Sequence, residues 1–375
     1  MKIGVLGAGQ LGRMLALAGL PLEMSFSFYD TSGAPSVGLG EVIVDKGGSG
    51  SELDKFLQQV DVVTYEFEHL PLELTKAIES KKPLHPSSES IRVCQNRIKE
   101  KALFKELGIP TAEYRIATNA KELESAAEEL GCPVVAKSVT EGYDGKGQAV
   151  LRDSAEAEAA WTAINHDSLI VESFVNFSRE LSIIAARSTS GEVAFYPLAE
   201  NSHHEGILRY SIAPAPKVSE PIQRQAQEYI KALLNELNHV GILTLELFET
   251  ADGLLANEMA PRVHNSGHWS IEGAASSQFE NHLRAITGLP LGDTQANKPT
   301  CMINIIAEKG DKESILKLPY AHLHLYGKSE RKGRKLGHVT VQADSYEELV
   351  WRVRNVASFL PGSPEFISSL TPSKK

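Results

Sequence analysis

The stretch from Asn257 to Trp269 reads NEMAPRVHNSGHW and gathers a carboxylate, an arginine, two histidines and two amides within thirteen residues. Upstream of it, apolar runs on both sides of Asp252 predict two strands joined by a tight turn. If that hairpin is symmetric about Asp252, Glu246 and Glu258 lie opposite each other, about 5 Å apart at Cβ. Two carboxylates this close repel unless a cation neutralises them, and Mg²⁺ with phosphate is the common case. The stretch therefore predicts a site for Mg²⁺ and phosphate, with two solvated glutamates as the alternative.

A glycine-rich turn forms a second candidate site. The run 133–137 predicts a strand that ends in Lys137, and the run 149–151 predicts its partner strand. Between them lie Gly142, Tyr143, Asp144, Gly145, Lys146, Gly147 and Gln148. Glycines let the backbone approach a phosphate closely, and Lys137 supplies a point charge. Because the Gly-Lys-Ser/Thr of a Walker A motif is missing, the pattern predicts a nucleotide lid, with a plain hairpin turn as the alternative.

The amino terminus carries a third pattern. An apolar strand over 1–6 leads into GAGQLG at 7–12 and a helix, which places backbone amides against an anion or a ribose. A second strand over 25–29 ends at Asp30, near the spacing that dinucleotide enzymes use for their ribose-binding acid. Taken alone, this half favours a nicotinamide-dependent dehydrogenase. The strand over 60–65 then delivers Glu66 to the carboxyl edge of the sheet, where ligands of open α/β sheets bind.

A basic loop near the carboxyl end reads GKSERKGRKLG at 327–337 and places five cations within eight residues of an acidic protein. The run alone is consistent with a solvated loop or with a site for an anion. Elsewhere, the pattern predicts one helix over 91–107, a polar loop over 201–207 and a helix over 272–286. Within the first helix, Arg97 and Lys101 share a face, and we expect Lys101 to be solvated.

These motifs together resemble the ATP-grasp ligases of purine biosynthesis, and most closely the 5-(carboxyamino)imidazole ribonucleotide synthase family. The likeness rests on Asn257-Glu258, on Ala260-Pro261-Arg262 and on the run from His264 to Trp269, and it extends from the first strand to the basic loop. It implies an α/β ATP-grasp fold in three parts. These are a Rossmann-like substrate-binding domain over 1–95, an ATP-grasp domain over 96–290 with a mobile lid at about 110–175, and a carboxyl-terminal domain over 291–375.

The resemblance also implies a reaction: ATP-dependent carboxylation of 5-aminoimidazole ribonucleotide by bicarbonate, through carboxyphosphate, giving ADP and phosphate in de novo purine biosynthesis. It assigns ATP to Arg97, Lys137, the turn 142–148, Glu172, Ser173, Phe174, Val175, Glu180, His203, Asn257 and Glu258. It assigns the ribonucleotide to Gln10, Leu11, Glu66, Lys328, Arg334 and Lys335. It assigns carboxyl transfer to Arg262, His264, Asn265 and Ser266, and Mg²⁺ to Glu246 and Glu258. We expect Glu66 to contribute more than its neighbour Glu68.

The nearest alternative is the formate-dependent glycinamide ribonucleotide transformylase, which shares the lid, the metal pair and the basic loop. Gln10 stands where that family typically has Glu, and Asn265 where it has Asp, so both positions favour the synthase. The nicotinamide-dependent dehydrogenase and a non-catalytic nucleotide sensor are alternatives from other classes.

Composition narrows the class of protein. A chain of 375 residues predicts two or three domains, and a net charge of −10 argues against nucleic-acid binding. Cys94, Cys132 and Cys301 are few and widely spaced, which favours a cytoplasmic protein without a disulfide frame or a zinc site. No apolar run approaches membrane-spanning length, so we expect no membrane contact. The family resemblance implies a homodimer.

Overall fold

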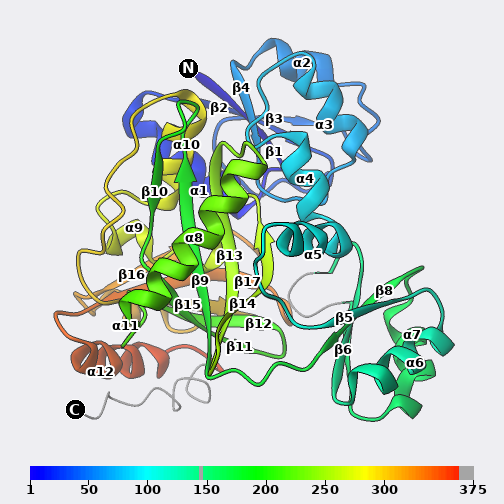
Figure 1. The fold of residues 1–375 in the computed structure, drawn as a ribbon. Coiled ribbons are helices and arrows are strands. Elements are labelled where there is room, and N and C mark those ends of the chain that lie inside the picture. The colour runs from blue at the N-terminus through cyan, green and yellow to red at the C-terminus, as the bar shows by residue number, and fades with distance from the viewer. Residues whose placement is uncertain (143–146, 363–375) are drawn as a thin grey trace.

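A computed structural model describes residues 1–142 and 147–362 of the chain. Its amino-terminal part is a parallel sheet in the order β3-β2-β1-β4, flanked by helices (Figure 1). The elements are β1 (Lys2–Leu6), α1 (Gln10–Gly19), the 3₁₀ turn η1 (Leu20–Leu22), β2 (Ser25–Asp30), β3 (Glu41–Val44), α2 (Leu53–Gln58), β4 (Val62–Tyr65) and α3 (Leu72–Glu79). The expected Rossmann-like βαβ arrangement is confirmed. Strand β3 was not predicted, because it has only four residues, of which one is buried, and they carry no apolar-polar alternation.

The single helix expected over 91–107 is wrong, because the structure has two helices there. They are α4 (Ser88–Cys94) and α5 (Arg97–Glu106), separated by Gln95 and Asn96. Asn96 has an extended backbone, and its side chain accepts a hydrogen bond from Lys99 N, which starts a new helix at Arg97. The amide side chain therefore places Arg97 in the first turn of α5.

A small antiparallel sheet in the order β5-β8-β6-β7 projects from the rest of the molecule, with two helices packed on it (Figure 1). Its elements are β5 (Tyr114–Ala117), α6 (Ala120–Leu130), β6 (Val134–Ser138), β7 (Gln148–Leu151), η2 (Ser154–Glu156), α7 (Ala157–Ile164) and β8 (Leu169–Ser173). Its core is separate, since Leu123 and Ala127 of α6 pack on Val134 and Val171 within one apolar cluster.

The large sheet runs in the order β14-β13-β9-β11-β12-β15-β17-β16, with β10 paired to β9. Its strands are β9 (Arg179–Arg187), β10 (Val193–Phe195), β11 (Ala199–His204), β12 (Ile207–Ala213), β13 (Gly241–Thr250), β14 (Gly253–Ala260), β15 (Thr300–Ile306), β16 (Ala321–Leu325) and β17 (Lys335–Gln342). The elements packed around it are α8 (Glu220–Glu236), η3 (Asn265–Gly267), α9 (Ser270–Gly273), α10 (Gln278–Thr287), α11 (Lys312–Leu316) and α12 (Tyr346–Ala357). Strand β15 pairs with β12, so the carboxyl-terminal segment extends the same sheet.

Two further expectations need correction in this sheet. The polar loop over 201–207 is the hairpin of β11 and β12, whose turn is Glu205-Gly206 with positive φ at both positions. The helix over 272–286 is interrupted, because α9 ends at Gly273 and Ser277 caps a separate helix α10. Sequence reasoning missed both features. A strand with polar side chains resembles a loop, and a polar residue that caps a helix resembles any other polar residue of a helical pattern.

The amino-terminal sheet and the large sheet share one apolar core. Phe26 and Phe28 of β2 belong to the same buried cluster as Phe279 and Leu283 of α10 and Trp269. This shared core fixes the parallel sheet against α10 and the large sheet. Within the described ranges, no helix has the length and hydropathy that crossing a membrane would require.

Candidate active site

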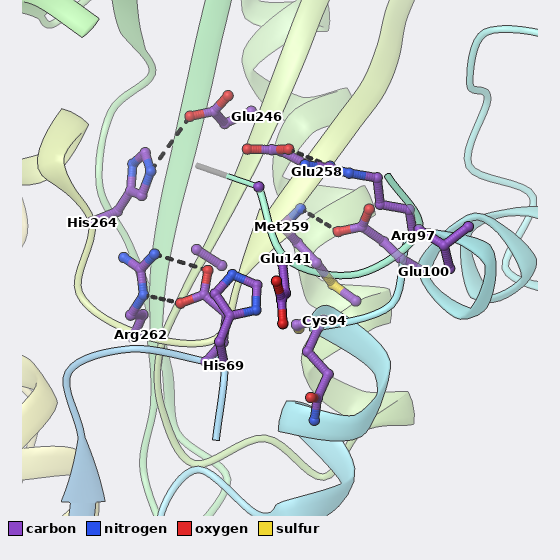
Figure 2. Close-up of a pocket in the computed structure, with 15 residues that line it drawn as sticks. His69, Cys94, Arg97, Glu100, Glu141, Glu246, Glu258, Met259, Arg262 and His264 are labelled. Atoms are coloured by element: carbon purple, nitrogen blue, oxygen red, sulfur yellow. Dashed lines mark hydrogen bonds and ion pairs between the residues drawn. The ribbon is translucent and has the colours of Figure 1, made fainter. Parts of the chain in front are cut away.

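A pocket opens where the amino-terminal sheet, α5 and the β13–β14 hairpin meet (Figure 2). Its walls are Glu68, His69, Cys94, Gln95, Arg97, Glu100, Val139, Glu141, Gly142, Glu246, Glu258, Met259, Ala260, Arg262 and His264. Six of these carry sequence predictions: Arg97, Gly142, Glu246, Glu258, Arg262 and His264. The pocket therefore gathers the predicted metal pair, two further predicted ATP ligands (Arg97 and Gly142) and two predicted carboxyl-transfer residues.

The β13–β14 hairpin brings both glutamates to this pocket by a register that differs from the predicted one. Near the turn, Thr250 pairs with Gly253 and Leu247 with Ala256, so the hairpin is not symmetric about Asp252. A bulge then shifts the register, and Leu245 pairs with Met259. The single residue Glu246 thus faces the two residues 257–258. Only the half of the hairpin that lies farther from the turn follows the predicted pairing.

The surroundings of the two carboxylates shift their pKa values in opposite directions. Burial alone would raise the pKa of Glu258, but Arg97 outweighs it, since its Nη1 lies 2.7 Å from Glu258 Oε2, and the pKa falls below its usual range. The pKa of Glu246 rises, because of burial and then because of the charge on Glu258. An acidic pair of which one member is driven toward protonation fits a divalent cation with oxygen ligands. The described residues contain no group of three or more His, Cys, Asp or Glu side chains that would hold a metal alone.

Arg262 is held rigidly on one side of the pocket. Its Nε and Nη2 both donate to the Glu68 carboxylate, and its Nη1 donates to the Val263 carbonyl at 3.2 Å. Burial would raise the pKa of Glu68, but the Arg262 charge outweighs it and lowers that pKa. A forked pair of charge-assisted bonds fixes the plane of the guanidinium. Glu68, expected to matter less than Glu66, lines the pocket, whereas Glu66 does not.

His264 is neutral, and its hydrogen bonds with Ser266 fix its tautomer. Burial and then the Arg262 charge lower its pKa to about 3. Its Nδ1 lies 2.9 Å from Ser266 Oγ and accepts a bond from Ser266 N at 3.3 Å, so Nε2 carries the proton. That Nε2 lies 3.5 Å from Glu246 Oε1. The imidazole therefore presents an N–H to the pocket at neutral pH.

A buried relay of hydroxyl and amide groups supports this tautomer. Ser211 donates to Asn201, Asn201 donates to Ser182, and Ser182 donates to Ser266, over distances of 2.7, 3.0 and 2.8 Å. Ser266 is fully buried and therefore lies beneath His264, outside the pocket wall. Asn265 also lies outside the wall, where its amide exchanges hydrogen bonds with Asn304.

The predicted ATP ligands Lys137, Glu172 and Asn257 form one buried cluster beside the pocket. Lys137 Nζ pairs with Glu172 Oε2 and lies 3.4 Å from Asn257 Oδ1. The expectation that Lys101 is solvated is wrong, because Lys101 is 2% exposed and lies 2.7 Å from Glu172 Oε1. Sequence spacing put Lys101 on the face of Arg97 but could not show that β8 and β14 cover that face.

The other predicted ATP ligands lie along β8, β9 and β11. His203 Nδ1 is 2.8 Å from Glu180 Oε2, and this bond outweighs burial and raises the pKa of His203. Phe174 is exposed after the end of β8, next to Ser173 and Val175. Gly147 and Gln148 lie at the start of β7. The predicted ligands Tyr143, Asp144, Gly145 and Lys146 fall outside the described residues.

The glycine loop after β1 is already filled by a carboxylate of this chain. Gly9 N donates to Glu66 Oε1 at 2.5 Å, and Gly12 N donates to Glu66 Oε2 at 2.8 Å. A Cβ at Gly9 would lie 2.8 Å from Glu66 Oε1, so the loop needs glycine there. Because Glu66 occupies the amides that would hold a pyrophosphate, this geometry argues against the nicotinamide alternative. The side chain of Leu11 packs in the core.

The basic loop meets this glycine loop across the molecule. Lys328 Nζ donates to Gln10 Oε1, although the two residues are 318 positions apart in sequence. Arg334 Nη1 donates to Ser329 Oγ at 2.9 Å, which folds the loop on itself. Lys335 begins β17 directly after this loop. Gln10, Glu66 and Lys328 thus come together at the glycine loop, whereas Leu11 does not join them.

Comparison with known proteins places the chain in a family. Family models match the ribonucleotide synthetase preATP-grasp domain over 1–95, the ATP-grasp domain over 102–279 and the phosphoribosylaminoimidazole carboxylase C-terminal domain over 300–352. The N5-carboxyaminoimidazole ribonucleotide synthase of Pseudomonas aeruginosa is 44% identical over 361 residues, covering 96% of this chain and 99% of that protein. The chain belongs to the N5-carboxyaminoimidazole ribonucleotide synthase family.

Solved structures of this family agree. The synthetase from Thermus thermophilus has a TM-score of 0.92 and 45% identity, and the match covers 96% of this chain and 99% of that one. The Aspergillus clavatus synthase, solved with ADP and 5-aminoimidazole ribonucleotide, has a TM-score of 0.87 and 32% identity, with 96% and 98% covered. The predicted ATP-grasp fold class is confirmed, and the chain is an ATP-grasp ligase.

Several residues of this synthase-family site escaped sequence reasoning. Gln278 clamps the His264 backbone, accepting from its N at 2.9 Å and donating to its O at 2.7 Å. Glu100 is buried at the pocket and accepts a bond from Met259 N, and burial raises its pKa to about 8. Such residues carry no motif of their own, and only the Glu100-Lys101 pair of adjacent charges on a helix could have signalled burial.

Proposed function

We infer that this chain makes N5-carboxyaminoimidazole ribonucleotide from 5-aminoimidazole ribonucleotide, ATP and bicarbonate, and we propose the following roles for its residues. The observation that carries them is the single pocket in which Arg97, Glu246, Glu258, Arg262 and His264 meet. One end of the site holds paired carboxylates, and the other lies beside a cluster of cations. That polarity suits a reaction between a metal-bound nucleotide and a second phosphorylated substrate.

ATP would bind between the small and large sheets. Lys137 and Arg97 supply positive charge for the phosphates, while Glu180 and His203 supply polar contacts on the neighbouring strands. Residues 172–175 form the end of β8 and its exposed continuation, which suits the adenine edge. The glycine turn that begins at Gly142 would cover the phosphates.

Mg²⁺ would be held by Glu246 and Glu258, with phosphate oxygens as its remaining ligands. When bound, the ion would neutralise charge on the phosphates of ATP. Arg97 already holds Glu258 in its ionised form, which is the form that a cation requires. The cation would also remove the repulsion that raises the pKa of Glu246.

Carboxyl transfer would take place beside Arg262 and His264. The γ-phosphoryl group of ATP moves to a bicarbonate oxygen, and ADP leaves. The amine of the ribonucleotide then attacks the carboxyl carbon of carboxyphosphate, phosphate leaves, and the amine loses a proton. The fixed Arg262 guanidinium would stabilise the negative charge of the carboxyl oxygens, and the His264 N–H would donate to them. Ser266 and Asn265 would act by orienting the segment that carries Arg262 and His264.

The ribonucleotide would lie between the glycine loop and the basic loop. Lys328, Arg334 and Lys335 would bind its 5′-phosphate, and Glu66 with Gln10 would meet the base and the ribose. We propose a homodimer on the family resemblance alone, and a cytoplasmic location on the few, widely spaced cysteines. Size-exclusion chromatography with light scattering tests the first of these.

One assay tests the reaction. ADP release is measured with ATP, Mg²⁺ and bicarbonate, with and without 5-aminoimidazole ribonucleotide, and we expect release to require the ribonucleotide. A parallel arm replaces bicarbonate and ribonucleotide by formate and glycinamide ribonucleotide. Faster ADP release in that arm would replace the proposed reaction with the transformylase reaction.

A further inference from the structure

Lys101 joins the two sheets that enclose the proposed ATP site. The side chain rises from α5 and is 2% exposed. Its Nζ lies 2.7 Å from Glu172 Oε1 and donates to the Asn257 carbonyl at 2.9 Å. Glu172 belongs to β8 of the small sheet, and Asn257 to β14 of the large sheet. One buried ammonium group therefore contacts both.

The same Glu172 carboxylate has a second cationic partner. Lys137 from β6 binds its other oxygen, so one buried carboxylate is shared by two ammonium groups. Burial would raise the pKa of Glu172, but Lys137 and Lys101 outweigh it and lower the pKa to about 2. The carboxylate is ionised, and either ammonium group alone would balance its single negative charge. A buried carboxylate keeps its charge at little cost only while such a partner stays beside it.

The two lysines differ in their freedom to move. Lys137 is 13% exposed, and its second contact, Asn257 Oδ1, is long at 3.4 Å. Lys101 is 2% exposed and is held by two short contacts. Lys137 is therefore the partner that can turn toward an incoming anion, while Lys101 stays in place.

We propose that Lys101 is a positioning residue for ATP binding. It keeps Glu172 neutralised while Lys137 turns from Glu172 to the phosphates. The inference rests on the proposed function, which assigns Lys137 to the phosphates of ATP. Without Lys101, Lys137 would be the sole counter-charge of Glu172, and its departure would leave a buried carboxylate unpaired, which proteins avoid. ATP would then have to bind against that cost.

Calorimetric titration with Mg²⁺ and a non-hydrolysable ATP analogue tests this role. Lys101→Met should raise the Kd of the analogue roughly 10- to 100-fold, because Lys137 stays on Glu172. Lys105→Met is the matched control, since Lys105 is exposed on the same helix, and its Kd should stay within about twofold of the unmodified protein. A Lys101→Met protein that binds the analogue as tightly as the Lys105→Met control would overturn the proposal.

A second background separates positioning from structural support. Glu172→Gln removes the carboxylate, so Lys137 is free whether or not Lys101 is present. In that background, Lys101→Met should change the Kd by less than about threefold relative to Glu172→Gln alone. An equal loss in both backgrounds would mean that Lys101 only supports the fold. If Lys101→Met does not fold, Lys101→Gln replaces it, because it removes the charge and keeps a donor for Asn257. Analogue binding needs no turnover, so failure of the proposed reaction would leave this test intact.

Discussion

At the scale of single residues, charge pairing decides what each side chain of the pocket can do. Glu258 and Glu246 share a pocket, yet Arg97 bonds only to Glu258. The lone pairs of Glu246 meet the Nε2–H of a neutral His264 at 3.5 Å, a weak contact for a buried charge. Glu246 is therefore the group whose ionisation is least compensated without a cation.

Replacing Glu246 by Gln should stabilise the protein at high pH and abolish activity. The folded-state pKa of Glu246 is raised, so the folded protein loses stability as pH rises from the unfolded pKa through the folded one. Removing the carboxylate should add roughly 1–3 kcal/mol at pH 8 and little at pH 5. Thermal melts at both pH values, without Mg²⁺, measure this difference, and Glu228→Gln on the exposed face of α8 is the control. An equal gain at both pH values would contradict the assignment.

Replacing Arg262 by Lys should lower kcat/KM by roughly 10²- to 10³-fold, because an ammonium group cannot form the forked pair with Glu68. Glu68→Gln keeps the guanidinium but weakens its hold, so its loss should be smaller, at roughly 10-fold. Steady-state product formation by both variants gives the order. If Glu68→Gln were the more damaging change, Glu68 would itself contact the reacting groups.

At the scale of secondary-structure elements, the predictions held where period and glycine pattern were strong. The βαβ start, the strand over 60–65, which contains β4, and the strand before Lys137 all follow apolar runs bounded by turn residues. The break at Asn96 and the bulge opposite Glu246 were not predicted, since one capping side chain inside a helical pattern and a register shift of one residue leave no periodic signal in the sequence.

Motif residues of the site could be named from sequence, whereas their supporting contacts could not. The sequence predicts that Lys101 is a solvated charge on a helix, but Glu172 of β8 pairs with it. The sequence indicates only that Ser182 belongs to an apolar strand, but its hydroxyl donates to Ser266. Glu66 and Glu68 are two residues apart, and their roles depend on which one meets the glycine loop. Long-range pairing of this kind leaves no local pattern.

The basic loop between β16 and β17 should serve the ribonucleotide and leave ATP unaffected. Its Lys328 contacts Gln10 of the amino-terminal domain, whereas Lys137 pairs with Glu172 of the small sheet. Arg334→Ala should raise the KM for the ribonucleotide roughly 10- to 100-fold, because a phosphate would lose a charge-assisted forked contact. Lys332→Ala removes one exposed cation of the same loop and should have little effect. A rise in the KM for ATP instead would assign the loop to the nucleotide.

At the scale of the whole molecule, the pocket exists only because separate bodies converge on it. The amino-terminal sheet supplies Glu68, α5 supplies Arg97, and the large sheet supplies Glu246 and Glu258. The shared apolar core around Phe279 fixes the first body against the last. The small sheet has its own core, and Lys101 links it to the others through an ion pair with Glu172 and a hydrogen bond to the Asn257 carbonyl. Ligands that bind between these bodies should therefore stabilise the whole fold.

The nucleotide at one end of the site and the ribonucleotide at the other should stabilise the fold independently, and melting curves can distinguish the two effects. At a ligand concentration of 100 Kd, binding adds about 2.7 kcal/mol to the stability of the folded state, which should raise Tm by a few degrees. With Mg²⁺ and ADP, this rise should disappear in Glu258→Gln and in excess chelator but persist in Arg334→Ala. With the ribonucleotide alone, the rise should persist in Glu258→Gln and in chelator but disappear in Arg334→Ala. Loss of both rises in either variant would show that the two ends form one coupled site, because removing charge at one end would then weaken binding at the other.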